Sequence, residues 1–184
     1  MIKVYEFLAD GFEDIEGLAP VDVLRRGGVD IQTVSVTGSE YVETSHGVTL
    51  RADILFEDAR FDDAAMLLLP GGMPGSATLD AHEGLREVLL SHASHGGYIG
   101  AICAAPLVPG RLGLLRGYRA TCYPGFEKYL EGADYTAERV TVDGKFVTGN
   151  GPGAVLPYAL TLLSLLAGED KAREIATGME IAFF

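Results

Sequence analysis

The most informative segment of the chain is Gly97-Tyr98-Ile99-Gly100-Ala101-Ile102-Cys103-Ala104-Ala105-Pro106. An apolar run that ends on a cysteine and continues into small residues predicts a buried strand that turns sharply at Cys103 into a helix. The free N–H groups at the start of a helix stabilise negative charge, so they lower the pKa of a thiol placed there. We therefore expect Cys103 to be an activated nucleophile. The alternative is an inert cysteine buried in the core.

Similar apolar runs alternate with helical patterns along the rest of the chain. We expect strands at residues 2–8, 31–36, 65–69 and 98–102, with a small β excursion at 42–55. We expect helices at residues 13–26, 85–93, 154–166 and 169–177. Continuous apolar strands are typical of a parallel sheet covered by helices on both faces. This order predicts an α/β fold with a doubly wound, mostly parallel sheet, whose functional residues gather at the carboxyl ends of the strands.

Length and composition restrict the class of protein. The 184 residues suit a single domain over residues 1–184. The formal net charge of -12 argues against nucleic acid and anionic membranes as partners, because both attract Lys and Arg. Cys103 and Cys122 are too few for a disulfide scaffold, and a charge interrupts the N-terminal apolar run, unlike a signal peptide. We therefore expect a cytoplasmic protein without a membrane span.

An acidic segment follows the first predicted strand, Ala9-Asp10-Gly11-Phe12-Glu13-Asp14-Ile15-Glu16. The helix dipole favours acidic side chains in a first turn, and this effect alone can explain them. Glu16 differs, because Pro20 cannot donate the hydrogen bond that the Glu16 carbonyl normally accepts, which predicts an irregular helix there. Since the segment lies at a strand-to-helix corner, we assign Glu16 to the functional site.

A glycine pair follows the third predicted strand, in Leu69-Pro70-Gly71-Gly72-Met73-Pro74-Gly75. Gly71 and Gly72 let backbone N–H groups approach a bound group, as an oxyanion hole requires, and a plain tight turn is the alternative. If Glu16 keeps its proton and donates it to the sulfur of Cys103, the two groups share one proton. Such a pair gives a reactive thiolate without a histidine.

Five segments, in their order and spacing, resemble the DJ-1/ThiJ/PfpI superfamily: residues 9–16, 20–26, 69–72, 101–106 and 151–153. The similarity extends from residue 2 to about residue 166 and is greatest to the branch with the parkinsonism-associated and YajL-like proteins. It implies a flavodoxin-like sheet, like that of class I glutamine amidotransferases, a homodimer, and a site without cofactor or metal ion. It also implies that Cys103 is the nucleophile, Glu16 its carboxylic partner, and the N–H groups of Gly72 and Ala104 the oxyanion donors.

Two positions depart from the pattern of this superfamily. Tyr123 stands where many relatives carry a histidine, and a phenol of pKa ~10 is a poor base at neutral pH. A Cys–His peptidase mechanism is therefore disfavoured. His46 stands where relatives often have arginine, in a loop that lies near the partner's cysteine in the family dimer. It is either an anion-binding or proton-transfer group across that interface or a solvated loop histidine.

The other cysteine and histidines receive structural interpretations. Strand alternation points Cys122 away from the side of Tyr123, so we interpret it as an inert thiol rather than one that resolves an oxidised Cys103. His82, His92 and His95 have no cysteine or carboxylate at metal-ligand spacing. No metal site is expected.

We therefore expect a cysteine-dependent protein that converts small reactive carbonyls such as methylglyoxal into hydroxy acids, by glyoxalase-type or deglycase-type chemistry. One alternative is an oxidative-stress redox sensor and chaperone in which Cys103 is oxidised to the sulfinate. Another is a silent scaffold in which the corner persists only for folding. The expected partners are a second copy of the chain and a small carbonyl substrate.

Overall fold

A seven-stranded sheet organises the chain in the computed structural model, which describes residues 2–181. The strands lie in the order β10-β11-β7-β6-β1-β2-β5. Their bounds are β1 Lys3–Leu8, β2 Asp30–Ser35, β5 Ile54–Leu55, β6 Ala64–Leu69, β7 Tyr98–Ile102, β10 Val140–Asp143 and β11 Phe146–Gly149. All neighbouring strands are parallel except β10, which is antiparallel to β11. The predicted flavodoxin-like α/β fold is confirmed.

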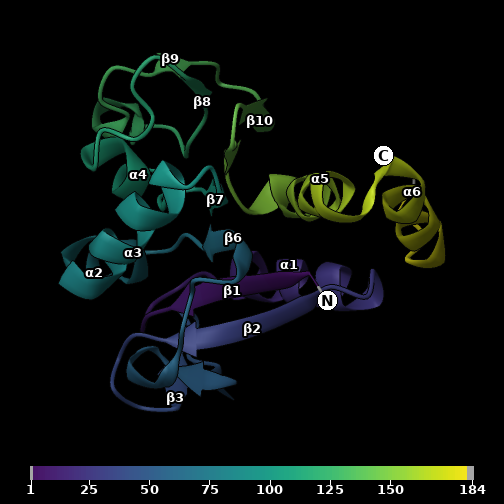
Figure 1. The fold of residues 1–184 in the computed structure, drawn as a ribbon, viewed down its shortest axis with the longest axis horizontal. Coiled ribbons are helices and arrows are strands. Elements are labelled where there is room, and N and C mark those ends of the chain that lie inside the picture. Colours follow the sequence, from purple (N-terminus) through teal and green to yellow (C-terminus); the bar gives the residue numbers. More distant parts are fainter. Residues whose placement is uncertain (1, 182–184) are drawn as a thin grey trace.

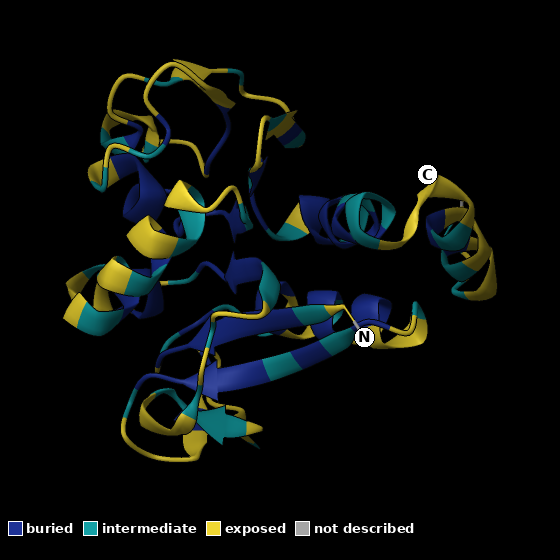
Figure 2. Cartoon of the chain, in the orientation of Figure 1, coloured by how far each residue is buried: buried dark blue, intermediate teal, exposed yellow. Residues whose placement is uncertain are grey.

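Helices cover both faces of this sheet (Figure 1). Met66 and Leu68 of β6 pack with α1 (Asp14–Arg26) and α5 (Val155–Ala167) on one face. Leu67 and Leu69 pack on the other face, with α2 (Gly75–Ala81), α3 (Glu83–Ser94) and α4 (Leu107–Arg111). Figure 2 shows that the central strands are buried, whereas yellow, exposed surface lies on α3 and on α6 (Glu169–Gly178). Burial on both faces explains why these strands are continuously apolar.

Short elements complete the described chain. The expected β excursion forms the hairpin of β3 (Tyr41–Glu43) and β4 (Thr49–Arg51), together with β5. The others are β8 (Arg119–Ala120), β9 (Asp134–Tyr135) and three 3-10 helices, η1 (Phe56–Asp58), η2 (Glu127–Tyr129) and η3 (Pro152–Ala154). The apolar end that the sequence predicts to need covering, Phe183 and Phe184, lies outside the described residues. Between residues 2 and 181, no helix has both the length and the apolar character to cross a bilayer.

The β10–β11 hairpin and helix α2 are absent from the expected elements. The hairpin turns at Gly144-Lys145, where Gly144 has φ +55°. Glycine at the first position of a two-residue loop between apolar runs is a hairpin signal, so the sequence contained the information. Helix α2 starts directly after the glycine turn that follows β6, and its seven residues are too few to give a clear helical period.

Candidate active site

Three neighbouring strands bring the predicted site residues together. β7, β6 and β1 are adjacent in the sheet, and Cys103, Gly71 and Glu16 follow their respective carboxyl ends. A β-carbon added to Gly71 would lie 2.6 Å from the Cβ of Cys103, 2.8 Å from the carbonyl oxygen of Ile102, and closer still to Oε2 of Glu16. Since real β-carbons do not approach other atoms so closely, only glycine fits here. Glu16 and Cys103 therefore meet in the space that a side chain at position 71 would occupy.

Cys103 has a left-handed backbone conformation, with φ +62°. This conformation is unfavourable for a residue with a side chain and persists only when its surroundings hold it. Its N–H donates to the carbonyl oxygen of Gly149 at 2.9 Å, and its own carbonyl oxygen accepts from the N–H of Tyr123 at 2.8 Å. Both bonds fix the sharp turn that presents the thiol. The side chain is buried, with only 8% of the residue exposed.

The helix after this turn starts later than the sequence predicts. Residues 103–106 form a turn, and α4 begins at Leu107. The first backbone hydrogen bonds here join residues three apart, for example from the Ala105 N–H to the Ile102 carbonyl. The first hydrogen bond between residues four apart, as in an α-helix, runs from the Gly110 N–H to the Pro106 carbonyl. The positive φ of Cys103 cannot belong to a right-handed helix, which explains the delay. The prediction that Cys103 adjoins a helix N-terminus is wrong.

Two backbone N–H groups, rather than the N-terminus of a helix, interact with the sulfur of Cys103. The backbone N–H groups of Gly72 and Ala104 are directed at the thiol of Cys103, and both lower its pKa. Gly72 has φ +88°, and a β-carbon there would lie 2.7 Å from the carbonyl oxygen of Gly11. The turn after β6 therefore requires glycine at this position as well as at Gly71. Two N–H donors aimed at one point form the geometry of an oxyanion hole.

Glu16 reaches the site from the first turn of α1. Glu13 is the N-cap, and its carboxylate accepts from the N–H of Glu16 at 2.9 Å, while the N–H of Glu13 donates to the Gly71 carbonyl at 2.9 Å. The capping role of Glu13 is not among the expected features, although an acidic residue three positions before a helical residue is a known capping signal. Helix α1 continues through Pro20, so Pro20 does not end the helix, and the irregularity at Glu16 stays a prediction.

Burial has the largest effect on the pKa values of both Glu16 and Cys103. Glu16 is fully buried, and its carboxyl makes no hydrogen bond of ordinary geometry to the described residues. Burial and the nearby charge of Glu13 raise the pKa of Glu16 to about 7, although contacts with Cys103 and the Gly71 N–H lower it. The pKa of Glu16 is raised, as the predicted proton on its carboxyl requires. At pH 7 about half of the molecules hold this proton.

The expected low pKa of Cys103 is wrong. Burial and the charge of Glu16 raise the pKa of the thiol to about 12, and the N–H groups of Gly72 and Ala104 only partly offset this. The two groups titrate as one unit, which releases its first proton near pH 7. In the singly ionised pair, Glu16 can accept the thiol proton when the sulfur attacks. The group placed to activate Cys103 is thus a neighbouring carboxylate rather than a helix dipole.

Two further predicted residues lie at the edge of the site. Tyr123 is 46% exposed, and its ring lies against Gly151, 3.2 Å from the position of a β-carbon there. His46 lies in the β3–β4 loop, where its Nδ1 is 2.5 Å from Oδ2 of Asp14. This contact raises the pKa of His46 and lowers that of Asp14. Within one chain His46 is therefore paired with a carboxylate, and its predicted role across a dimer interface stays a prediction.

The remaining cysteine and histidines are packed away from the pair. Cys122 is buried in the core, and burial raises its pKa to about 12, which suits an inert thiol. His82 caps α3 by accepting from the Leu85 N–H at 3.0 Å. His92 and His95 bond the backbone oxygens of Tyr98 and Ser91, respectively, at 3.0 and 2.8 Å. These contacts explain all three histidines without a metal ion.

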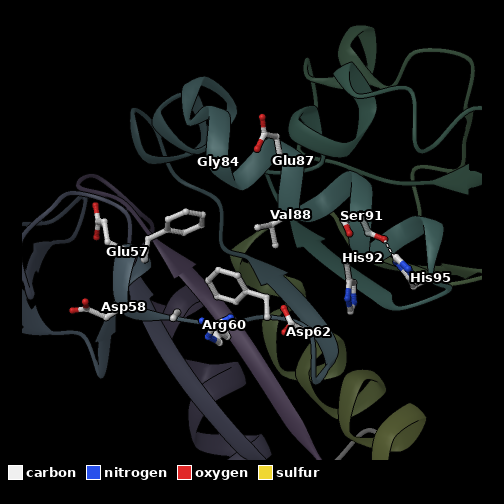
Figure 3. Close-up of a pocket in the computed structure, with 13 residues that line it drawn as sticks. Glu57, Asp58, Arg60, Asp62, Gly84, Glu87, Val88, Ser91, His92 and His95 are labelled. Carbon is white, nitrogen blue, oxygen red and sulfur yellow. Dashed lines mark hydrogen bonds between the residues drawn. The ribbon is translucent and has the colours of Figure 1, made fainter.

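Two grooves lie at different places on the surface. One of about 420 Å³ lies beside the Gly72 turn and is lined by Asp10, Gly11, Glu43, Thr44, Ser45, Met73 and Pro74. Figure 3 shows the other, of about 1060 Å³, between residues 56–62 and α3. Its walls precede the amino ends of β6 and β7, whereas Cys103 follows the carboxyl end of β7. The larger groove is therefore separate from the Cys103–Glu16 pair.

Replacing Gly71 with Ala should disrupt the pair. The added methyl group collides with Glu16 and Cys103, so we expect Cys103 alkylation to slow by on the order of 100-fold. Gly153→Ala is the matched control, because a β-carbon there meets nothing within 4 Å. Iodoacetamide labelling of both variants checks this. Equal rates of Cys103 labelling in the two variants would show that Gly71 does not determine how Glu16 and Cys103 lie relative to each other.

The raised pKa of Glu16 should make stability depend on pH. A carboxyl whose pKa is higher in the folded state contributes stability below its unfolded value of about 4.5, and this contribution is lost as pH rises through about 7. The loss corresponds to roughly 3 kcal/mol between pH 5 and pH 8. Glu16→Gln, which cannot ionise, should lack it. Urea unfolding at both pH values checks this, and parallel pH dependences in the two proteins would contradict it.

Comparisons with known proteins identify the family of the chain. Residues 2–165 match the model of the DJ-1/PfpI family. The chain is 40% identical to Protein DJ-1 homolog B of Arabidopsis thaliana over 95% of its own length, but it spans only about 40% of that relative. It is 31% identical to the glutathione-independent glyoxalase DJR-1.2 of Caenorhabditis elegans, covering 89% of this chain and 87% of that one. The solved structure of oxidized Toxoplasma gondii DJ-1 superposes with a TM-score of 0.95 at 34% identity, over 100% of both chains. The chain belongs to the DJ-1/PfpI family.

Proposed function

We propose that this chain is a cysteine-dependent glyoxalase that converts small 2-oxoaldehydes such as methylglyoxal into 2-hydroxy acids, without a cofactor. The observation that carries the proposal is the buried thiol of Cys103 beside a carboxyl whose pKa is about 7, with two N–H groups directed at the sulfur. The glyoxalase activity in the name of the Caenorhabditis elegans relative supports the same reaction class.

The first step joins the substrate to the protein. Ionised Glu16 accepts the thiol proton while the sulfur of Cys103 attacks the aldehyde carbon, so a C–S bond forms and the C=O π bond breaks. The product is a hemithioacetal, whose oxygen carries the negative charge. The N–H groups of Gly72 and Ala104 stabilise that oxygen.

The second step rearranges the adduct without an external oxidant. Glu16 first returns its proton to the hemithioacetal oxygen and is again a carboxylate. It then moves a proton from the former aldehyde carbon to the neighbouring carbonyl carbon, through an enediolate, while the hemithioacetal hydroxyl proton passes to the neighbouring oxygen. The first carbon is thereby oxidised to a thioester and the ketone is reduced to an alcohol, so the redox change stays within the substrate. Water then cleaves the thioester, which releases the hydroxy acid and returns the thiol to Cys103.

A second candidate function is redox sensing through Cys103. The structurally similar Toxoplasma gondii DJ-1 was solved in an oxidized form, and this observation supports redox chemistry as a candidate function. In this chain an oxidised sulfur would lie beside the same N–H groups and the Glu16 carboxyl. Peptide hydrolysis is disfavoured, because Tyr123 supplies no base at neutral pH.

Lactate formation from methylglyoxal separates the two functions. Wild type and Cys122→Ala should turn over, with a rate that rises through about pH 7 as Glu16 ionises. Cys103→Ser should lose at least ~100-fold of the activity, because serine is a far weaker nucleophile than cysteine. Absence of lactate from wild type, together with ready addition of two oxygen atoms to Cys103 by peroxide, would reject the glyoxalase in favour of the sensor.

We also propose that two copies of the chain pair through α1 and the β3–β4 hairpin. Large apolar side chains are exposed there, namely Ile15, Leu18, Tyr41 and Val48, and the Ser45 N–H ties the hairpin to the Phe12 carbonyl at 2.7 Å. Two-fold pairing is the commonest way to cover such surface. Light scattering at micromolar concentration should give a dimer mass. Leu18→Glu should shift it toward the monomer, whereas Leu90→Glu on α3 should not.

A further inference from the structure

Glu6 is a buried carboxyl that the proposed mechanism does not use. It lies in the central strand β1, where it interrupts an otherwise apolar run, and only 1% of the residue is exposed. Its Oε2 has no hydrogen-bond partner among the described residues. The cation that acts on it, Arg25, already donates to the Ile31 carbonyl and to Asp53. Burial raises the pKa of Glu6 well above its ordinary value and so favours the neutral carboxyl.

Tyr158 is a second buried acid group on the same face of the sheet. It belongs to α5, is 1% exposed, and has a hydroxyl without a hydrogen-bond partner in the described chain. A β-carbon added to Gly100 would lie 2.5 Å from this hydroxyl oxygen, so the glycine leaves the space that the hydroxyl occupies. Burial and the charges of Glu6 and Glu16 raise the pKa of Tyr158 well above its ordinary value.

Strand register places these groups in one row under the active site. Glu6 of β1 pairs with Leu68 of β6, and Leu68 pairs with Gly100 of β7. Neighbouring strands lie about 4.8 Å apart, so the row spans roughly 10 Å. Cys103 follows Gly100 by three residues, which places it about 10 Å further along the strand direction. Glu16, on α1, covers the same face as this row.

Unpartnered buried polar groups destabilise a fold, so a pair of them beside a functional site calls for a role. The charged groups that act on them are Arg25 on Glu6 and Glu16 on Tyr158, while Glu13 and Cys103 act in turn on Glu16. A carboxylate at Glu16 repels a second negative charge, so it disfavours ionisation of the Tyr158 hydroxyl. Burial favours the neutral form of both inner groups while Glu16 ionises.

We propose that Glu6 and Tyr158, the inner acid pair, set the pH at which Glu16 activates Cys103. Neutral O–H groups are dipoles that stabilise a nearby carboxylate, which the surrounding apolar core cannot do. They are positioning residues, because they act on Glu16 and do not touch the substrate. The inference rests on the proposed roles of Cys103 and Glu16.

The test is the pH profile of Cys103 alkylation by iodoacetamide, followed by peptide mapping and measured without substrate. Wild type should show an inflection near pH 7. Tyr158→Phe and Glu6→Leu each remove a dipole, so each should raise the inflection by roughly 0.5 to 1 pH unit. Glu6→Gln, which keeps a neutral polar group of the same shape, should shift it by less than about 0.3 unit. Glu6→Leu should also raise the melting temperature, because it removes a buried unpartnered carboxyl.

Unchanged inflections in Tyr158→Phe and Glu6→Leu, with changes in melting temperature only, would overturn the proposal. A lower inflection in Glu6→Leu would also overturn it, because that result means that Glu6 is charged in the native protein. If Glu6→Leu does not fold by circular dichroism, Tyr158→Phe decides. Shifted inflections without lactate formation reject the glyoxalase alone, whereas lactate formation with unshifted inflections rejects the inner acid pair alone.

Discussion

The close approach of Glu16 and Cys103, in the space left free by the missing side chain of Gly71, is the constraint on which the rest of the site depends. It requires β1, β6 and β7 to lie side by side and to end at one edge of the sheet. It also requires a residue without a side chain between the two reactive groups. The hydrogen bond from Glu13 to the Gly71 carbonyl then fixes helix α1 to the β6 turn. Fold and chemistry are thus specified by the same few contacts.

The parts of the site that could be predicted from sequence are those with a local signature. An apolar run that ends on a cysteine indicates the corner at Cys103, and paired glycines after a buried strand indicate the turn at Gly71. The parallel sheet followed from the alternation of strand and helix patterns, since the connection rules leave few arrangements for such a series. The capping role of Glu13 had a local signature too. It was not predicted, because the helix dipole by itself accounts for acidic residues in a first turn.

The parts that could not be predicted depend on contacts between distant segments. The pKa of Cys103 rises because the thiol is buried under α1, and no local pattern reports the depth of burial. The position of Tyr158 over Gly100 joins residues 58 positions apart, and its relation to Glu6 needs the register of three strands. The delayed start of α4 arises from one backbone angle at Cys103, which small neighbours permit but do not specify.

The two backbone bonds of Cys103 have a consequence for what the site can hold. Because its N–H and its carbonyl are bonded to Gly149 and Tyr123, from two other segments, the main chain at this corner cannot yield when an adduct forms. An adduct on the sulfur can therefore be accommodated only by rotation of the Cys103 side chain about its Cα–Cβ bond, and this side chain is nearly enclosed. A rigid corner around a nearly enclosed sulfur therefore fits the small carbonyl substrates of the proposed function better than it fits a folded protein surface.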